Sequence, residues 1–156
     1  MSTTIDKYEE YLAKTKIPLR LSCTTESGWP FVLSLWYLYR GGFLYSATKN
    51  TAKVVGYLSS NPQCAFEIAS DFPPYCGLRG QAIAEINPNL GPDILMDLID
   101  RYLGDRNNPL AKRLLKDLDS EVALIFRPVN LFKWNFSSRM EGISTAMIAL
   151  HVKTCP

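Results

Sequence analysis

Residues 31–48, FVLSLWYLYRGGFLYSAT, decide how this chain folds. The stretch 31–39 is almost continuously apolar, which is typical of a strand whose two faces are covered by protein, by a ligand or by another subunit. Arg40-Gly41-Gly42 predicts a tight turn, because glycine tolerates positive φ. Residues 43–48 then predict a returning strand, and so short a turn requires antiparallel pairing.

Periodicity predicts the remaining elements. Before the deciding stretch, residues 6–14 read as a short amphipathic helix, and residues 17–24 alternate as a half-buried strand does. After it, we expect a helix at 51–60 that ends at Asn61-Pro62, strands at 63–70 and 78–86, helices beginning at Pro92 and at Asn108-Pro109, and strands at 121–127 and 129–136 separated by Pro128.

Seven strands joined largely by short turns predict a mainly β fold with flanking helices (α+β), arranged as a small closed or partly closed antiparallel barrel. The whole chain, 1–156, reads as one domain. Its core is expected at about 15–136, with a helical insertion at about 91–119 and a C-terminal tail at about 137–156.

Composition excludes several classes of protein. The 156 residues are 47% hydrophobic and 21% charged, a globular balance, and the net charge of +2 is too small to favour a nucleic-acid partner. No apolar run approaches the ~20 residues of a membrane span, so no membrane partner is expected. The first 16 residues lack the apolar centre of a signal peptide, which predicts a cytoplasmic protein.

Cysteine and histidine restrict the chemistry further. Cys23, Cys64, Cys76 and Cys155 are scattered without metal-binding spacing, so neither a zinc site nor a disulfide framework is expected. His151 is the single histidine, which rules out a multi-histidine metal site in one chain. Any nucleophile activated by histidine would depend on that one residue of the tail.

Hydroxyl and lysine side chains gather where the strand at 43–48 runs into the next helix. Ser46, Thr48 and Thr51 can donate hydrogen bonds, and Lys49 and Lys53 stand four residues apart. The N-terminus of a helix offers free N–H groups to an anion, so the stretch outlines a phosphate site. The alternative is a capped surface helix with two solvated lysines.

Aromatic residues could form a site for a flat ring. Trp36, Tyr37 and Tyr39 lie on the strand before the turn, and Trp134 lies on the last strand; ordinary barrel core is the alternative for each. Arg79, on a strand of small residues, meets a ligand or a partner chain, or is simply solvated.

Order and spacing of several motifs resemble the pyridoxamine 5′-phosphate oxidase-like superfamily of flavin-binding split β-barrels. The resemblance covers about residues 15–86, with weaker agreement over 121–136, and it rests on these segments: Leu19-Arg20-Leu21-Ser22-Cys23-Thr24, Gly28-Trp29-Pro30, Val32 to Tyr39, Gly42 to Thr48, Lys53, Asn61-Pro62-Gln63-Cys64-Ala65-Phe66 and Gly77-Leu78-Arg79-Gly80-Gln81-Ala82.

The resemblance implies an antiparallel split β-barrel of the FMN-binding type that dimerises and holds its cofactor between subunits. Position by position, it implies that the phosphate meets Ser46, Ala47, Thr48, Lys49, Thr51 and Lys53. The strand residues Leu33, Ser34, Leu35 and Trp36 would edge the flavin ring, and Trp134 would lie near it.

The expected function is therefore that of an FMN-binding oxidoreductase. The flavin would carry hydride or electron transfer between an electron donor and a small-molecule substrate, neither of which the sequence identifies. One alternative is a reductase of the same fold that uses the deazaflavin F420. Another is a non-catalytic flavin- or haem-binding protein, for which His151 would be the one histidine able to ligate haem iron.

Overall fold

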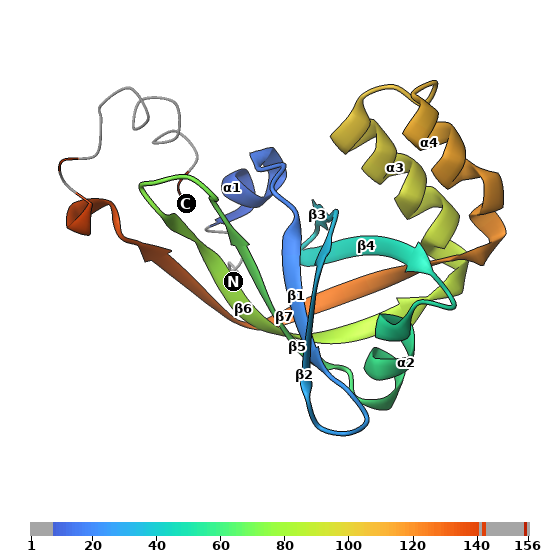
Figure 1. Cartoon of the computed structure of the whole chain (residues 1–156), viewed down its shortest axis with the longest axis horizontal. Helices are drawn as coiled ribbons and strands as arrows, with labels where there is room; N and C mark the ends of the chain where they lie inside the picture. Colours follow the sequence, from blue (N-terminus) through green and yellow to red (C-terminus); the bar gives the residue numbers. More distant parts are fainter. Residues whose placement is uncertain (1–7, 141, 143–154, 156) are drawn as a thin grey trace.

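A computed structural model describes residues 8–140, 142 and 155 (Figure 1). The helices are α1 (Glu9–Lys14), α2 (Lys53–Ser60), α3 (Gly91–Leu103) and α4 (Pro109–Leu114), with 3₁₀ turns η2 (Pro88–Leu90), η3 (Leu115–Ser120) and η4 (Ser137–Arg139). The strands are β1 (Leu19–Thr24), β2 (Pro30–Leu35), β3 (Leu38–Arg40), β4 (Phe43–Lys49), β5 (Gln63–Ala69), β6 (Cys76–Asn87) and β7 (Glu121–Asn135).

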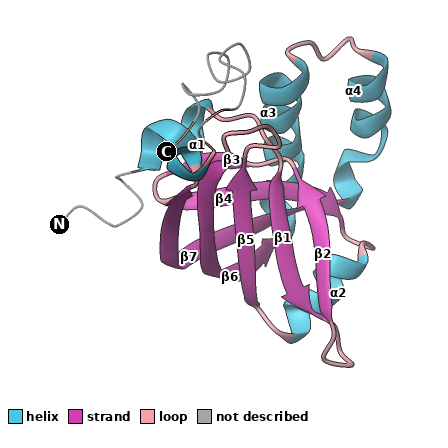
Figure 2. Ribbon diagram, turned by 60° about the vertical axis from the view of Figure 1, so that its left-hand side comes forward, coloured by secondary structure: helices cyan, strands magenta, loops and turns pink. Residues whose placement is uncertain are grey.

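The seven strands form one antiparallel sheet in the order β2-β1-β5-β6-β7-β4-β3. β2 and β3 lie at opposite edges, although only Trp36 and Tyr37 separate them in sequence. In a flat sheet those edges would be about 29 Å apart, whereas two residues bridge about 11 Å. The sheet therefore curls until its edges meet at residues 36–37 (Figures 1 and 2). The predicted mainly β fold with flanking helices is confirmed.

Two predicted strand boundaries are wrong. The stretch 31–39 is not one strand, because it breaks at residues 36–37, where Tyr37 turns its side chain fully into the core. Conversely, 121–127 and 129–136 are joined in one strand, β7. Gln81 pairs with Asn130 and Ala82 with Pro128, so Val129 is an extra residue, and this bulge accommodates the proline within the strand.

Apolar side chains on the inner face of the sheet form the main core. Along β1 the buried residues alternate as predicted, and α2 closes one end of the curled sheet with Val54 and Leu58. α1 covers another part of this core with Tyr11 and Leu12. Residues 6 and 7 of the predicted first helix lie outside the described residues.

The helical insertion packs on the outer face of β4 and β7. Its apolar residues are buried as the periodicity predicted: Ile94, Leu95, Leu98 and Ile99. Gly104 ends α3 with a φ of 70°, and the Asn108 side chain accepts a hydrogen bond from the Leu110 N–H at 2.8 Å, which caps α4. Gly91 begins α3 against the backbone of Glu121, where no side chain would fit.

Tyr37 and Arg101 hold the bend between β2 and β3 onto the end of α1. The Tyr37 hydroxyl lies 3.0 Å from the carbonyl oxygens of both Leu12 and Thr15. Arg101 donates to the same two carbonyls and to Ala13, with its guanidinium 5.4 Å from the Tyr37 ring centroid. The last carbonyls of a helix lack partners within it, so these side chains satisfy groups that burial would otherwise leave unpaired.

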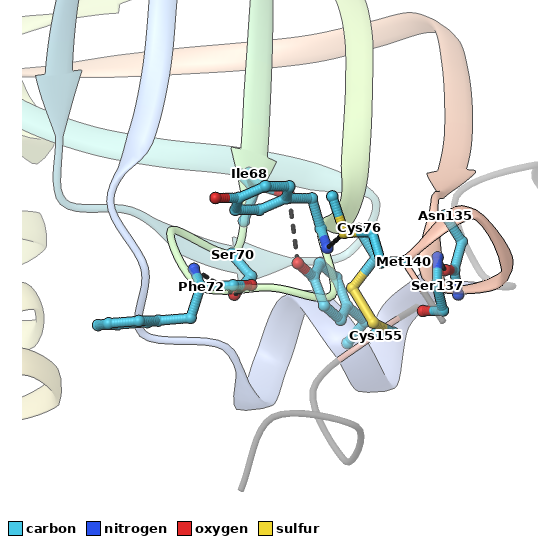
Figure 3. The surroundings of a disulfide bond; sticks show 10 residues. Ile68, Ser70, Phe72, Cys76, Asn135, Ser137, Met140 and Cys155 are labelled. Carbon is cyan, nitrogen blue, oxygen red and sulfur yellow. Dashed lines mark hydrogen bonds between the residues drawn. A yellow bond between two sulfur atoms is a disulfide. The ribbon is translucent and has the colours of Figure 1, made fainter. Parts of the chain in front are cut away.

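Contrary to the sequence prediction, one disulfide is present, between Cys76 at the start of β6 and Cys155 (Figure 3). The two Cα atoms lie 5.7 Å apart across a separation of 79 residues. The sequence could not indicate this pair, because it is the fold that brings the residues together. Cys23 and Cys64 are free and buried.

We predict that Tyr37→Phe lowers the free energy of unfolding by about 1–3 kcal/mol, because it leaves buried carbonyls with one donor fewer. Urea denaturation monitored by circular dichroism measures the change. Tyr57→Phe is the matched control, since the Tyr57 ring packs on Phe31 at 5.3 Å and no hydrogen bond of its hydroxyl is found among the described residues. Equal losses in the two variants would show that the hydroxyl of Tyr37 does not stabilise the bend.

Candidate functional site

Two strands leave the bend at residues 36–37 with backbone edges that the described sheet does not pair. β2 pairs only with β1, so its other edge is open from Pro30 to Leu35. β4 pairs with β3 only over Phe43–Tyr45, so the corresponding edge of 46–49 is open as well. Within the described chain these are backbone N–H and C=O groups available to a ligand, and a flat, polar-edged ring is the kind of ligand they suit.

Three residues separate the open edge of β4 from the start of α2. Its N-cap residue, Ala52, supplies no side-chain hydrogen bond to the helix, and the first helical residue is Lys53. The Lys53 side chain is exposed and, within the part of the chain that the structure describes, forms no ion pair. Thr51 is exposed beside it. Uncapped N–H groups, a hydroxyl and an unpaired ammonium together suit an anion such as a phosphate.

Lys49 is occupied elsewhere. Its ammonium lies 2.9 Å from the Glu121 carboxylate, 2.8 Å from the Asp117 carbonyl oxygen and 2.7 Å from the Ser120 hydroxyl. The hydrogen bond that Lys49 donates to the Glu121 carboxylate is the main cause that raises the pKa of Lys49 above its usual value. Glu121 is only 5% exposed, so Lys49 neutralises a buried carboxylate and ties the end of β4 to the start of β7.

The remaining predicted phosphate residues on β4 alternate between the two faces of the sheet. Ser46 is fully buried, and its hydroxyl has no hydrogen-bond partner among the described residues. Ala47 packs under α3. Thr48 is partly exposed and lies on the open edge of β4, so of the three it is the residue that a bound group can reach most directly.

In the predicted ring-binding strand, β2, the backbone edge is accessible, whereas the aromatic ring of Trp36 is packed against other residues. Leu33 and Leu35 pack on the main core, and Ser34 points to the outer face. The Trp36 ring lies parallel to the ring of Tyr102, with 5.0 Å between centroids, and packs in the two apolar clusters beneath α3. Trp36 is therefore part of the packing that fixes the bend.

Within one chain, Trp134 is remote from the predicted phosphate residues of β4. Ser46 pairs with Leu124, and ten residues of β7 separate Leu124 from Trp134, or about 33 Å of strand. The Arg79 guanidinium lies 5.0 Å from the centroid of the Trp134 ring, and the indole N–H is buried without a partner in the described chain. The predicted set is thus divided into an edge group on β2, β4 and α2 and a second group at Trp134.

Sequence reasoning missed a trough on the outer face of β1, β2, β5, β6 and β7, with a volume of about 580 Å³. Its lining includes Arg20, Ser22, Val32, Glu67, Arg79 and Phe132. Val32 and Phe132 are 65% and 57% exposed, which is unusual for apolar side chains on strands. Both occupy positions where alternation predicts polar residues, and that was the available signal.

Gly80 and several charged side chains line the trough. A side chain at Gly80 would come within 2.7 Å of the Asn130 carbonyl oxygen and of the Phe66 ring. Arg79 lies 3.6 Å from Glu67, and Arg20 forms an ion pair with Asp71. The sequence left three alternatives for Arg79: contact with a ligand, contact with a partner chain, or solvation. In the structure, Arg79 lines this concave surface and contacts Glu67 and the Trp134 ring.

A metal centre requires a cluster of ligating side chains, and a membrane-spanning helix requires a long apolar segment. Among the described residues, no cluster of three or more histidine, cysteine, aspartate or glutamate residues is placed to hold a metal ion. Likewise, no helix described here has both the length and the apolar character that crossing a bilayer requires.

Solved structures resemble this chain closely in fold. One described as an F420 reductase is 22% identical, with a TM-score of 0.68, over 79% of this chain and 94% of its own. A conserved hypothetical protein from Mycobacterium tuberculosis is 16% identical, with a TM-score of 0.73, over 93% of each chain. A putative pyridoxamine 5′-phosphate oxidase from Listeria innocua is 16% identical, with a TM-score of 0.63, over 84% of this chain and 98% of its own.

No family model and no curated protein matches the sequence. The structural matches confirm the predicted architecture: the chain has the split-barrel fold of the pyridoxamine 5′-phosphate oxidase-like proteins. At these identities the likeness establishes the fold.

Substitution of the two lysines of the predicted phosphate stretch should change the free energy of unfolding by different amounts. Lys49→Gln should lower the free energy of unfolding by about 1–3 kcal/mol, because the buried Glu121 carboxylate loses its counter-charge. Lys53→Gln should change it by less than about 0.5 kcal/mol. Urea unfolding at pH 7 measures both, and equal effects would contradict the structural role of Lys49.

The same pair predicts a pH dependence. Because the folded-state pKa of Lys49 is raised, its contribution is complete below the ordinary lysine pKa and is lost as pH rises through the raised value. The difference between wild type and Lys49→Gln should therefore be constant from pH 7 to 9 and shrink at more alkaline pH.

Proposed function

We propose that this protein is an FMN-binding oxidoreductase that acts as a homodimer and transfers hydride or electrons between a donor and a small-molecule substrate. The observation that carries the proposal is the junction of the open edges of β2 and β4 with the uncapped N-terminus of α2, where Lys53 is unpaired. Backbone edges suit a flavin ring, and the helix terminus suits its phosphate.

At the phosphate end, the proposed contacts are the N–H groups that open α2, the hydroxyls of Thr48 and Thr51, and the Lys53 ammonium. Lys49 supports this end indirectly, since it fixes the end of β4 to Glu121. The buried Ser46 hydroxyl without a partner lies two residues before Thr48, and unsatisfied groups of this kind are exceptions in folded proteins that call for an explanation, such as a ligand.

At the ring end, the residues from Leu33 to Trp36 would orient the flavin through backbone hydrogen bonds from β2. When bound, FMN supplies the redox chemistry, so the chain needs no histidine-activated nucleophile of its own. The stacked rings of Trp36 and Tyr102 keep the start of both open edges in place. An N–H of β2 directed at the ring would also influence its reduction potential.

A homodimer accounts for two features that one chain leaves unexplained. Val32 and Phe132 expose apolar surface across the trough, and a second copy would cover it. Trp134 lies too far along β7 to serve the same flavin as Thr48 in one chain, whereas a partner's Trp134 could approach the site from across the interface. The proposed compartment is the cytoplasm, and no nucleic-acid partner is proposed.

An F420-dependent reductase is the second candidate, and the structural match to an F420 reductase favours it. F420 carries a long acidic tail that would require several unpaired cations. In the described chain the start of α2 offers Lys53, while Lys49 is already neutralised by carboxylates. One unpaired lysine fits a single phosphate better, so FMN is the proposed cofactor.

Purified protein should show a flavin absorption spectrum, or should retain added FMN at about one per subunit after gel filtration. Lys53→Ala should weaken FMN binding about tenfold or more, since a hydrogen bond to a charged group contributes about 1.5–3 kcal/mol. Thr48→Ala should weaken it less. Lys112→Ala, an exposed lysine on α4, is the control and should bind FMN as wild type does.

The outcomes that contradict this assignment are distinct. Unchanged FMN affinity in Lys53→Ala would show that the FMN phosphate does not bind at Lys53. Retention of F420 but not FMN would favour the second candidate. A protein that binds flavin or haem but transfers no electrons with any donor would be a carrier or sensor; His151, the histidine available for haem, lies outside the described residues.

The dimer proposal predicts that Val32→Asp and Phe132→Asp shift the protein from dimer to monomer in sedimentation velocity, because each buries a carboxylate in the proposed interface. Leu110→Asp, on α4 and 38% exposed, should leave the dimer intact. A wild-type protein that sediments as a monomer at all accessible concentrations would overturn the proposed dimer.

A further inference from the structure

We propose that Cys76 and Cys155 form a reversible thiol–disulfide switch that controls local order at the end of the sheet carrying Trp134. This inference goes beyond the proposed function and does not depend on cofactor binding. It rests on the position of the disulfide, on the strand ends that are hydrogen-bonded beside it and on the different exposure of the four cysteines.

The disulfide lies where β5, β6 and β7 end together (Figure 3). Cys76 is opposite Asn135, and the next pair in the register is Gly77 with Trp134. The Ser70 N–H donates to the Cys76 carbonyl at 3.1 Å, and the Phe136 N–H donates to the Tyr75 carbonyl at 2.9 Å. The backbone carbonyls of Cys76 and Tyr75 therefore hold the connection from β5 to β6 and the end of β7.

Beyond these hydrogen bonds, several contacts among the described residues of this end of the sheet involve aromatic side chains. The ring centroids of Trp134 and Phe136 are 5.2 Å apart, and the Arg79 guanidinium carbon lies 5.0 Å from the centroid of the Trp134 ring. The Tyr75 nitrogen lies 3.5 Å from the Met140 sulfur. Phe72, Tyr75 and Phe136 are 51%, 39% and 37% exposed. Side chains this exposed bury little apolar surface, so a covalent cross-link at Cys76 adds to the order of the segments that carry them.

The two sulfur atoms of the disulfide are unequally accessible. Cys76 is fully buried, whereas Cys155 is partly exposed. A thiolate from solution therefore attacks the Cys155 sulfur, the S–S bond breaks, and its electron pair goes to the Cys76 sulfur, which takes up a proton. A second thiol then attacks the mixed disulfide and frees Cys155, so that two thiols of the reductant are oxidised to one disulfide.

Re-formation requires an oxidant, and we assign that role to a low-molecular-weight disulfide of the glutathione class. Cys155 attacks it to form a mixed disulfide and releases one thiol. Cys76 then attacks the Cys155 sulfur and releases the second. In the cytoplasm proposed above, disulfides are usually transient and catalytic or redox-sensing rather than structural, which fits a switch better than a permanent cross-link.

Cys23 and Cys64 act as internal references. Both are buried and free, and burial raises the pKa of each thiol, to about 12 for Cys64. Thiols and alkylating reagents from solution do not reach such protonated, enclosed thiols in the folded protein at neutral pH. Reagent that reaches a cysteine of the folded protein should therefore report on the Cys76–Cys155 pair.

The experiment exposes the full chain to glutathione buffers from fully oxidised to fully reduced, blocks free thiols with a maleimide and locates the adducts by peptide mass spectrometry. Oxidised, folded protein should carry no adduct. Reduced, folded protein should carry one at Cys155, with Cys23 and Cys64 unmodified until urea is added. Oxidised glutathione should reverse the change.

Amide hydrogen exchange on the same samples tests the effect on order. Exchange at Ser70 and Phe136 should be at least about tenfold faster in the reduced protein, while Asn50, which donates to the Ser120 carbonyl at 2.8 Å, should be unchanged. The melting temperature should fall by about 5–10 °C. In Cys155→Ser these amides should exchange rapidly in both buffers, so this variant controls for effects of the reductant.

Two results would overturn the proposal: maleimide at Cys155 in the oxidised, folded protein, or equal exchange at Ser70 and Phe136 in both redox states. Neither involves flavin. If the protein passes these tests but binds no FMN, the proposed switch is supported and the proposed function is contradicted. If it binds FMN but fails these tests, the proposed function is supported and the switch is contradicted.

Discussion

The contact of Tyr37 and Arg101 with the end of α1 is the interaction on which the rest of the fold depends. It fixes the two residues at which a seven-stranded sheet meets its own opposite edge. The contact is buried at the Tyr37 hydroxyl and partly buried at Arg101, and it joins three segments: α1, the bend at 36–37 and α3. A side chain lost here would affect the curvature of the sheet as well as a few hydrogen bonds.

The same bend produces the candidate site. β2 and β3 would be one strand if the chain continued straight, and the backbone of β4 would then be paired along its whole length. Because the chain turns at Trp36, the N–H and C=O groups of 46–49 and of β2 are left open. The curl of the sheet and the exposure of the backbone edges at which a ligand is proposed to bind are thus two results of one break in one strand.

Much of this could be predicted from the sequence, and the errors have physical causes. Alternation identified β1, and helical period identified α3, because burial there follows local pattern. The number of strands was right only because two errors cancelled: 31–39 divides and 121–136 joins, and both depend on tertiary contacts. Lys49 and Lys53 looked equivalent because Glu121 lies 72 residues after Lys49 in sequence. Cys155 was equally remote from Cys76.

The position of α3 and α4 also limits how this protein can assemble. They cover the outer face of β4 and the first half of β7, and Gly91 brings them against the backbone there. Among the described residues, only the other half of the outer sheet face remains open. A copy bound to that face about a twofold axis would cover it on both molecules. In the proposed homodimer, the insertion would thereby leave no outer sheet face for a third copy.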